Sequence, residues 1–210
     1  MTQAKLASQL AAGLQALQLE LPASAQTRML EYVALLAKWN AAYNLTAVRD
    51  PAQMITRHLL DSLAIAPLLR GKRIIDVASG AGLPGIPLAL AFPDRHFVLL
   101  DAIGKKTRFM VQALATLGLG NAEVVQARVE DYQPEEGFAT VISRAFASLT
   151  DFVRLTEHLC NPDGCWLAMK GAVPEAEIEA LPAGFRVEAV HPLGVPGLDA
   201  ERCVVAILKA

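Results

Sequence analysis

The chain has 210 residues, of which 53% are hydrophobic and 19% are charged. This composition supports one large domain with a buried core and excludes an intrinsically disordered chain. The formal net charge is −2, so a nucleic-acid partner would have to be held by a local cationic patch. No uninterrupted apolar run reaches transmembrane length, and we expect neither a membrane span nor a secretion signal.

The chain contains three cysteines, Cys160, Cys165 and Cys203, and none of them has C-x-x-C spacing. An odd number without metal-type spacing predicts free thiols in a reducing compartment. We therefore expect a cytoplasmic protein that has no metal site.

The first 70 residues predict a helical extension. Leucines recur at three- and four-residue steps from Leu6 to Leu21, and this spacing predicts an amphipathic helix that Pro22 ends. A second helix is predicted over residues 24–42.

A third helix is predicted to begin at Asp50, with Pro51 as its first helical residue, and to run to about Ala66. It carries His58 and Asp61 about one turn apart. For His58, a polar residue bonded within helix packing is favoured over a catalytic base, and we expect both side chains to be structural.

From Lys72 onward the pattern changes to alternating strands and helices, which predicts an α/β doubly wound, Rossmann-like sheet. The last two strands have no helix between them, only turn residues, so they should pair as an antiparallel C-terminal hairpin. We place the boundary between the helical extension, 1–70, and the sheet domain, 71–210. Strands are predicted at 73–77, 96–101, 121–126, 139–144, 164–170, 184–191 and 201–209, and helices at 84–92, 104–117, 148–160 and 174–181.

A glycine loop follows the first predicted strand. The strand carries Asp76 near its end, and Gly80, Gly82 and Gly85 come within the next nine residues. Glycines there allow a ligand to approach the backbone at the carboxyl edge of a parallel sheet. A tight turn alone would explain one glycine but not three, so the loop predicts a nucleotide-type cofactor site.

The second predicted strand ends on Asp101, a position where a carboxylate accepts hydrogen bonds from ribose hydroxyls in this class of fold. After the third strand, Val129 and Glu130 would suit the adenine edge of the cofactor. An exposed acidic turn explains that second pair nearly as well.

The fourth predicted strand ends in Ile142-Ser143-Arg144-Ala145-Phe146. It lacks the Asn/Asp-Pro-Pro-aromatic motif of enzymes that methylate exocyclic base amines. The cysteines are also poorly placed to act as nucleophiles in methylation of a pyrimidine carbon. Arg144 instead puts a permanent cation at the mouth of the sheet.

Cations gather at the same edge of the predicted sheet. Three of them open a helix, where they oppose the helix dipole, and the others stand at strand ends. Any one of them could be an ordinary solvated side chain at the surface, but as a set they are typical of a protein that binds the phosphate backbone of a nucleic acid. These candidate RNA-binding residues are Lys105, Lys106, Arg108, Arg128, Lys170 and Arg202.

The string Asp-Val-Ala-Ser-Gly-Ala-Gly-Leu-Pro-Gly at 76–85 resembles motif I of the class I S-adenosylmethionine methyltransferases. In that class the glycine loop runs under the methionine and ribose parts of the cofactor, and the sheet carries an antiparallel terminal hairpin. The Gly-x-Gly-x-x-Gly spacing also matches the dinucleotide fingerprint, so an NAD-dependent oxidoreductase is the alternative.

The resemblance becomes specific along nearly the whole chain, which is similar to the RsmG (GidB) family. Its signature strings are 38–46, 57–62, 82–87, 100–101 with 105–106, 128–130 and 142–148. The resemblance implies S-adenosyl-L-methionine-dependent methylation of guanine N7 in 16S rRNA, at guanine 527. The partner would be that RNA or the small ribosomal subunit, with no DNA and no membrane, and the enzyme a monomer.

The resemblance also implies which residues surround the cofactor: Ala78, Gly80, Leu83, Val129, Glu130 and Arg144, to which the fold adds Gly82 and Asp101. It implies no acid–base catalyst, with Arg144 as the one candidate among positioning groups. Ala78 departs from the pattern, because many members carry glycine there. That departure leaves a second alternative, a non-catalytic ribosome-binding factor with reduced cofactor affinity.

Overall fold

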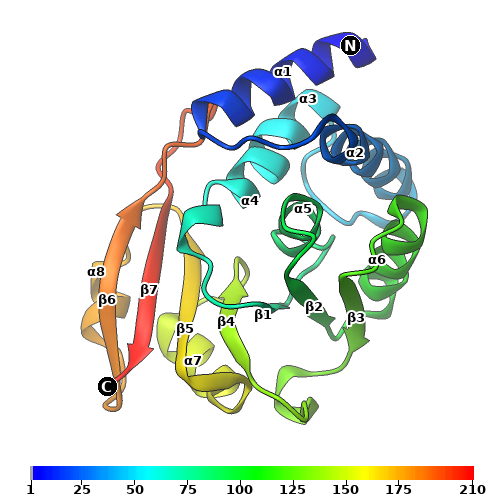
Figure 1. The fold of residues 1–210 in the computed structure, drawn as a ribbon. Coiled ribbons are helices and arrows are strands. Elements are labelled where there is room, and N and C mark those ends of the chain that lie inside the picture. Colours follow the sequence, from blue (N-terminus) through cyan, green and yellow to red (C-terminus); the bar gives the residue numbers. More distant parts are fainter. Residues whose placement is uncertain (1) are drawn as a thin grey trace.

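Seven strands form one mixed sheet in the order β3-β2-β1-β4-β5-β7-β6 (Figure 1). The computed structural model describes residues 2–210. Strands β1 to β5 run parallel, and β7 lies antiparallel between β5 and β6. This is the predicted doubly wound sheet with its terminal hairpin. The strands are β1 (Arg73–Val77), β2 (His96–Asp101), β3 (Ala122–Gln126), β4 (Phe138–Ser143), β5 (Cys160–Lys170), β6 (Phe185–Pro192) and β7 (Cys203–Lys209).

Helices cover both faces of the sheet (Figure 1). One face carries the N-terminal helices with α5 and α6, and the other carries α7 and α8. Short 3-10 turns lie at Ala66–Leu68, Val129–Asp131 and Glu157–Leu159. The α-helices are α1 (Gln3–Ala16), α2 (Ala23–Tyr43), α3 (Pro51–Met54), α4 (Asp61–Leu63), α5 (Gly85–Ala91), α6 (Gly104–Leu117), α7 (Leu149–Thr156) and α8 (Glu175–Glu179), with a π-helix at Ile55–Leu60 between α3 and α4.

The N-terminal helices and the sheet share one apolar core. Leu10, Tyr32 and Leu36 lie in the same cluster as Phe97 of β2 and Phe109 of α6, and all five are fully buried. Burial of such side chains is the main stabilising term of folding. The division at residue 70 therefore marks a change of sequence pattern across which packing is continuous.

The first predicted helix is too long. Helix α1 ends at Ala16, because Leu17 caps it and Gln18 adopts a left-handed conformation with φ of 56°. The leucine spacing continues to Leu21 because Leu19 and Leu21 still pack against the core as an irregular segment. Periodicity predicted their burial correctly and their conformation wrongly.

The third predicted helix is interrupted by the π-helix. Asp50 caps it as expected, since its carboxylate accepts from the Ala52 N–H at 3.3 Å. The π turn then widens the backbone hydrogen-bonding pattern around His58. Among residues 2–210 no helix has the length and apolar character needed to cross a membrane.

The three cysteines are unpaired, as the sequence predicts.

Candidate functional site

The loop that follows β1 is held by Asp76 and Ser79. One carboxylate oxygen of Asp76 accepts from the Gly85 N–H at 2.8 Å, and the Ser79 hydroxyl donates to the Asp76 carbonyl at 2.7 Å. Gly80 has φ of 62°, and a Cβ placed there would meet only the Ala78 carbonyl at 4.0 Å. The loop thus keeps open space above Gly80, which a side chain would fill.

Asp101 holds the same loop from the end of β2. Its carboxylate accepts from the Gly80 and Ile103 N–H groups, both at 2.9 Å, and from the Lys106 ammonium at 3.4 Å. The side chain is buried, so these bonds offset the cost of removing its charge from water. The position expected to meet a ribose therefore also fixes the shape of the glycine loop.

Asp76 is fully buried, and its second carboxylate oxygen has no hydrogen-bond partner within residues 2–210. Burial raises its pKa from 3.8 to about 7, against the opposing effect of the Gly85 N–H. A carboxyl with a pKa this high is partly protonated near neutral pH.

A cavity of about 200 Å³ lies over the glycine loop, and we call it the loop cavity. Four of the residues predicted to contact the cofactor line it: Ala78, Gly80, Leu83 and Arg144. Its lining is Leu45, Thr46, Ala78, Ser79, Gly80, Ala81, Leu83, Lys106, Arg144 and Ala145. The open space above Gly80 fits a ligand that approaches the backbone closely.

The other predicted cofactor residues lie outside that lining. A Cβ at Gly82 would run into Ile86 of α5, so this glycine serves helix packing. Val129 and Glu130 sit in the 3-10 turn after β3, on the same carboxyl edge of the sheet. Ile103, which the sequence analysis missed, is 46% exposed beside Asp101 and offers an apolar surface there.

The segment after helix α2 lines the loop cavity through Leu45 and Thr46, and α2 itself holds the lining in place by hydrogen bonds. The Tyr32 hydroxyl donates to the Ala81 carbonyl at 2.7 Å, and the Asn40 side chain bonds the Thr46 N–H at 2.9 Å and the Val48 carbonyl at 3.2 Å. Sequence reasoning missed these three polar residues, although two of them lie within the family string at 38–46. For Tyr32 and Asn40 the signal was a polar side chain on an otherwise apolar helix face, whereas Thr46 lies after the helix and gave no such signal.

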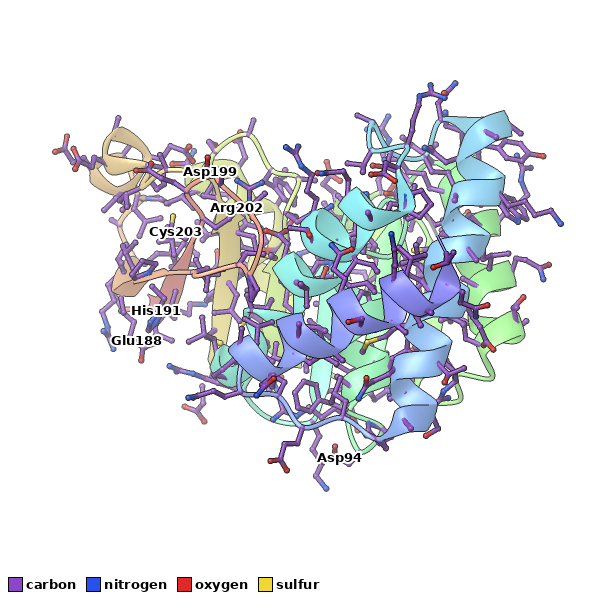
Figure 2. All side chains as sticks on the ribbon, turned by 90° about the horizontal axis from the view of Figure 1, so that it is seen from above. Asp94, Glu188, His191, Asp199, Arg202 and Cys203 are labelled. Atoms are coloured by element: carbon purple, nitrogen blue, oxygen red, sulfur yellow. The ribbon has the colours of Figure 1, made fainter. Side chains whose placement is uncertain are left out.

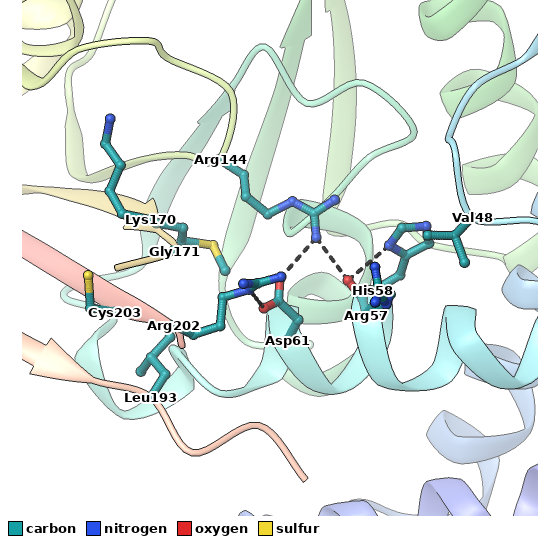
Figure 3. Close-up of a pocket in the computed structure, with 11 residues that line it drawn as sticks. Val48, Arg57, His58, Asp61, Arg144, Lys170, Gly171, Leu193, Arg202 and Cys203 are labelled. Carbon is teal, nitrogen blue, oxygen red and sulfur yellow. Dashed lines mark hydrogen bonds and ion pairs between the residues drawn. The ribbon is translucent and has the colours of Figure 1, made fainter. Parts of the chain in front are cut away.

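A second cavity of about 360 Å³ adjoins the first, and we call it the arginine cavity (Figure 3). Arg144 lines both cavities, and the Thr46 hydroxyl of one wall bonds the His58 ring of the other at 2.9 Å. Its charged lining is four cations, Arg57, Arg144, Lys170 and Arg202, and one carboxylate, Asp61. The site is therefore two-chambered, with a cationic chamber beside the glycine loop.

His58 is held by two hydrogen bonds, because its other ring nitrogen contacts the Arg57 carbonyl at 2.9 Å. Burial, and then the nearby Arg144 cation, lower its pKa from 6.5 to about 4. The ring is therefore neutral at pH 7 and bonded within the packing, in line with the structural role expected from the sequence.

The predicted RNA-binding cations separate into two groups. Lys106 pairs with Asp101, Lys170 with Glu177 at 2.8 Å, and Arg202 with Asp61 at 3.0 Å. The remaining three have no carboxylate partner within residues 2–210, and they are Lys105, Arg108 and Arg128. Lys105 instead donates to the Tyr43 carbonyl at 3.0 Å.

The family is decided by sequence comparison. A family model described as "GidB: rRNA small subunit methyltransferase G" matches residues 25–205. This chain belongs to the GidB family. The relative from Ectopseudomonas mendocina, named ribosomal RNA small subunit methyltransferase G, is 52% identical over 206 residues, which cover 97% of this chain and 96% of the relative. The same-named protein of Shewanella loihica is 49% identical over 205 residues, covering 98% and 99%.

Solved structures confirm the class I methyltransferase fold. An S-adenosylmethionine-dependent methyltransferase from Aquifex aeolicus matches with a TM-score of 0.58 and 19% identity, over 76% of this chain and 94% of that one. The glycopeptide N-methyltransferase MtfA, solved with S-adenosyl-L-homocysteine, matches with a TM-score of 0.61 and 12% identity, over 73% and 87%. The GidB chain is a methyltransferase that uses S-adenosylmethionine, and this assignment removes the oxidoreductase alternative.

Proposed function

We propose that this GidB chain methylates guanine N7 in small-subunit rRNA, at guanine 527. The loop cavity would hold the cofactor and the arginine cavity the target base. The observation that carries the proposal is the shared wall: Arg144 lines both cavities, so a cofactor and an acceptor would meet beside it.

The geometry of the loop cavity suits the cofactor. Gly80 leaves the space above the backbone open, and Asp101 lies at the end of β2 where ribose hydroxyls bind in this class of fold. S-adenosylmethionine supplies a methyl group on a positively charged sulfur. The chain's task is then to hold the acceptor nitrogen in line with that methyl group and to exclude water.

Guanine N7 carries an in-plane lone pair and no proton, so no base is needed before methyl transfer. The polar groups of the arginine cavity agree with this requirement. His58 is neutral and has both ring nitrogens bonded, which leaves no free lone pair aimed into the cavity. A guanidinium group is a cation with five hydrogen-bond donors and no acceptor, so Arg144 would position the reactants.

Outside the two cavities, three further cations would contact the RNA backbone. Arg108 and Arg128 are exposed and have no carboxylate partner within residues 2–210, and Lys105 lies at the start of α6, three residues before Arg108. Phosphate contacts of this kind supply affinity without reading sequence.

The test is methylation of purified 16S rRNA and of small ribosomal subunits with methyl-labelled S-adenosylmethionine. Product carrying 7-methylguanosine is cleaved by aniline after borohydride reduction, and the cut locates the modified base. A cut at guanine 527 is the expected result. Label in an amine or a carbon of another base, or no transfer to either substrate, would refute the proposal.

The Gly80→Val variant separates the cofactor site from the RNA site, because its side chain would fill the open space of the loop cavity. Calorimetry should show that this variant no longer binds S-adenosylmethionine, whereas its RNA affinity should be close to that of wild type. Equal loss of both affinities would indicate general unfolding, which circular dichroism would detect.

A further inference from the structure

Asp61 lies between two arginines that come from distant parts of the chain. One carboxylate oxygen accepts from Arg144 Nη1 and the other from Arg202 Nε, each at 3.0 Å (Figure 3). Asp61 itself is only 2% exposed, whereas both arginine side chains are 28% exposed. A buried carboxylate thus holds two guanidinium groups whose other ends reach the arginine cavity.

The backbone supplies a second anchor. The Asp61 N–H donates to the Thr56 and His58 carbonyls, so it passes over the Arg57 carbonyl between them. Arg144 Nη1 donates to that carbonyl at 3.2 Å. The π-helix therefore turns a carbonyl toward the arginine, and π turns are frequent at functional sites.

Each arginine keeps donors free of this anchoring. Within residues 2–210, Arg144 forms its side-chain hydrogen bonds through Nη1 alone, and Arg202 uses Nε and Nη1. The remaining N–H groups belong to planar forks whose orientation is already set.

Figure 2 places Arg202 on the connection that leads into β7, apart from Glu188 and His191 on β6.

We infer that Asp61 is a positioning residue for substrate: it orients Arg144 and Arg202 so that their free donors bind the anionic backbone around the target nucleotide. The inference rests on the proposed function. Free arginine side chains lose rotamer freedom when they bind a ligand, and a preformed fork loses less. Asp61 pre-orders both forks through one buried group.

The sign of one substitution separates this role from simple electrostatics. A carboxylate near RNA phosphates repels them, so removing its charge should strengthen binding if charge alone matters. If Asp61 positions the arginines, Asp61→Asn should weaken binding although the net charge becomes more favourable. We expect an RNA dissociation constant raised roughly tenfold, the scale of one well-oriented charged contact.

The experiment measures binding of purified 16S rRNA across a salt series, together with calorimetry against S-adenosylmethionine and thermal unfolding. Asp61→Asn should weaken RNA binding and reduce the salt slope by about one to two units, because each phosphate that an arginine no longer neutralises lowers it by roughly one. Ser62→Ala is the matched control, because Ser62 is buried in the same helix and its hydroxyl has no hydrogen-bond partner within residues 2–210. It should leave RNA affinity and slope at wild-type values.

A double-mutant comparison tests whether Asp61 acts through the arginines. In the Arg144→Gln/Arg202→Gln background, Asp61→Asn should change RNA affinity no further, because its targets are gone. If Asp61→Asn fails to fold, Arg202→Lys tests the other half of the inference, namely that the oriented guanidinium and not its charge alone binds RNA. Lysine keeps the charge but not the planar fork of donors. This variant too should bind RNA more weakly.

Tighter RNA binding by Asp61→Asn, an unchanged slope, or wild-type affinity of Arg202→Lys would overturn the inference. These outcomes leave the proposed function standing as long as the wild-type chain binds and methylates rRNA. Absence of methylation by wild type would instead refute the proposed function itself.

Discussion

Ala78 is strained, and relief of that strain can be measured. It has φ of 59°, a left-handed conformation that costs an L-residue with a side chain about 1–2 kcal/mol. Replacement by glycine removes this cost but adds freedom to the unfolded chain, which offsets about 0.4–1 kcal/mol. We therefore expect Ala78→Gly to raise the free energy of unfolding by about 1 kcal/mol.

The reverse change is available two residues away. Gly80 has nearly the same φ, 62°, and a Cβ there would meet nothing closer than 4.0 Å. Gly80→Ala should therefore lower stability by about 1 kcal/mol through backbone strain alone, without a clash. Because Gly80 lines the loop cavity, this variant should also bind S-adenosylmethionine more weakly, whereas Ala78→Gly should bind it at least as well as wild type.

Urea denaturation at fixed pH measures both changes, and thermal unfolding should shift by roughly 2–4 °C in opposite directions. Equal m-values for the variants and wild type would show that the substitutions change stability without changing the surface exposed on unfolding. If Ala78→Gly were less stable than wild type, the left-handed conformation would not be the source of strain at this position.

Three other predictions concern titration, catalysis and RNA binding. Between about pH 6.5 and 4, His58 binds a proton in the unfolded chain but not in the folded chain, so acidification through this range lowers the free energy of unfolding. Asp76 has the opposite effect, because its pKa is about 7 in the folded chain and 3.8 in the unfolded chain, so the folded chain binds the proton first. Urea titrations at pH 7 and pH 5 measure the free energy of unfolding of each variant minus that of wild type. On going from pH 7 to pH 5, this difference should increase for His58→Gln and decrease for Asp76→Asn. A change of the same sign in both variants would refute the assignment. With RNA and cofactor saturating, single-turnover methylation should be flat across neutral pH in wild type and in His58→Ala, and a histidine limb that disappears in the variant would make His58 a base. Arg108→Ala and Arg128→Ala should each lower the salt slope of RNA binding by about one unit, with S-adenosylmethionine affinity unchanged; an unchanged slope would make them ordinary surface residues.

Local sequence signals predicted the elements that local interactions determine. Helix α6 spans Gly104–Leu117 as predicted, because Gly118 ends it in a left-handed C-cap. Asp101 and Arg144 were predicted as site residues because the carboxyl ends of parallel strands share one edge. That rule needs only the identity of the strand and not its contacts.

The rest depended on contacts between distant residues. The π-helix leaves no mark on the apolar spacing of residues 55–60, so the sequence indicated an ordinary helix there. Asp61 meets Arg202 across 141 positions, a contact that exists only because β7 inserts between β5 and β6. The pairing of Lys170 with Glu177 was equally invisible, and it removed one cation from the free set.

Helix α2 works as a spacer of fixed length. The Tyr32 hydroxyl donates to the Ala81 carbonyl, and the Asn40 side chain accepts from the Thr46 N–H. Ala81 and Thr46 both line the loop cavity, and Asn40 lies eight residues after Tyr32 on the same helix. Eight helical residues span about 12 Å, and each inserted or deleted residue would turn one contact about 100° away from the other. Homologues should therefore show no insertion or deletion between the positions of Tyr32 and Asn40, even where the exposed residues of this interval differ.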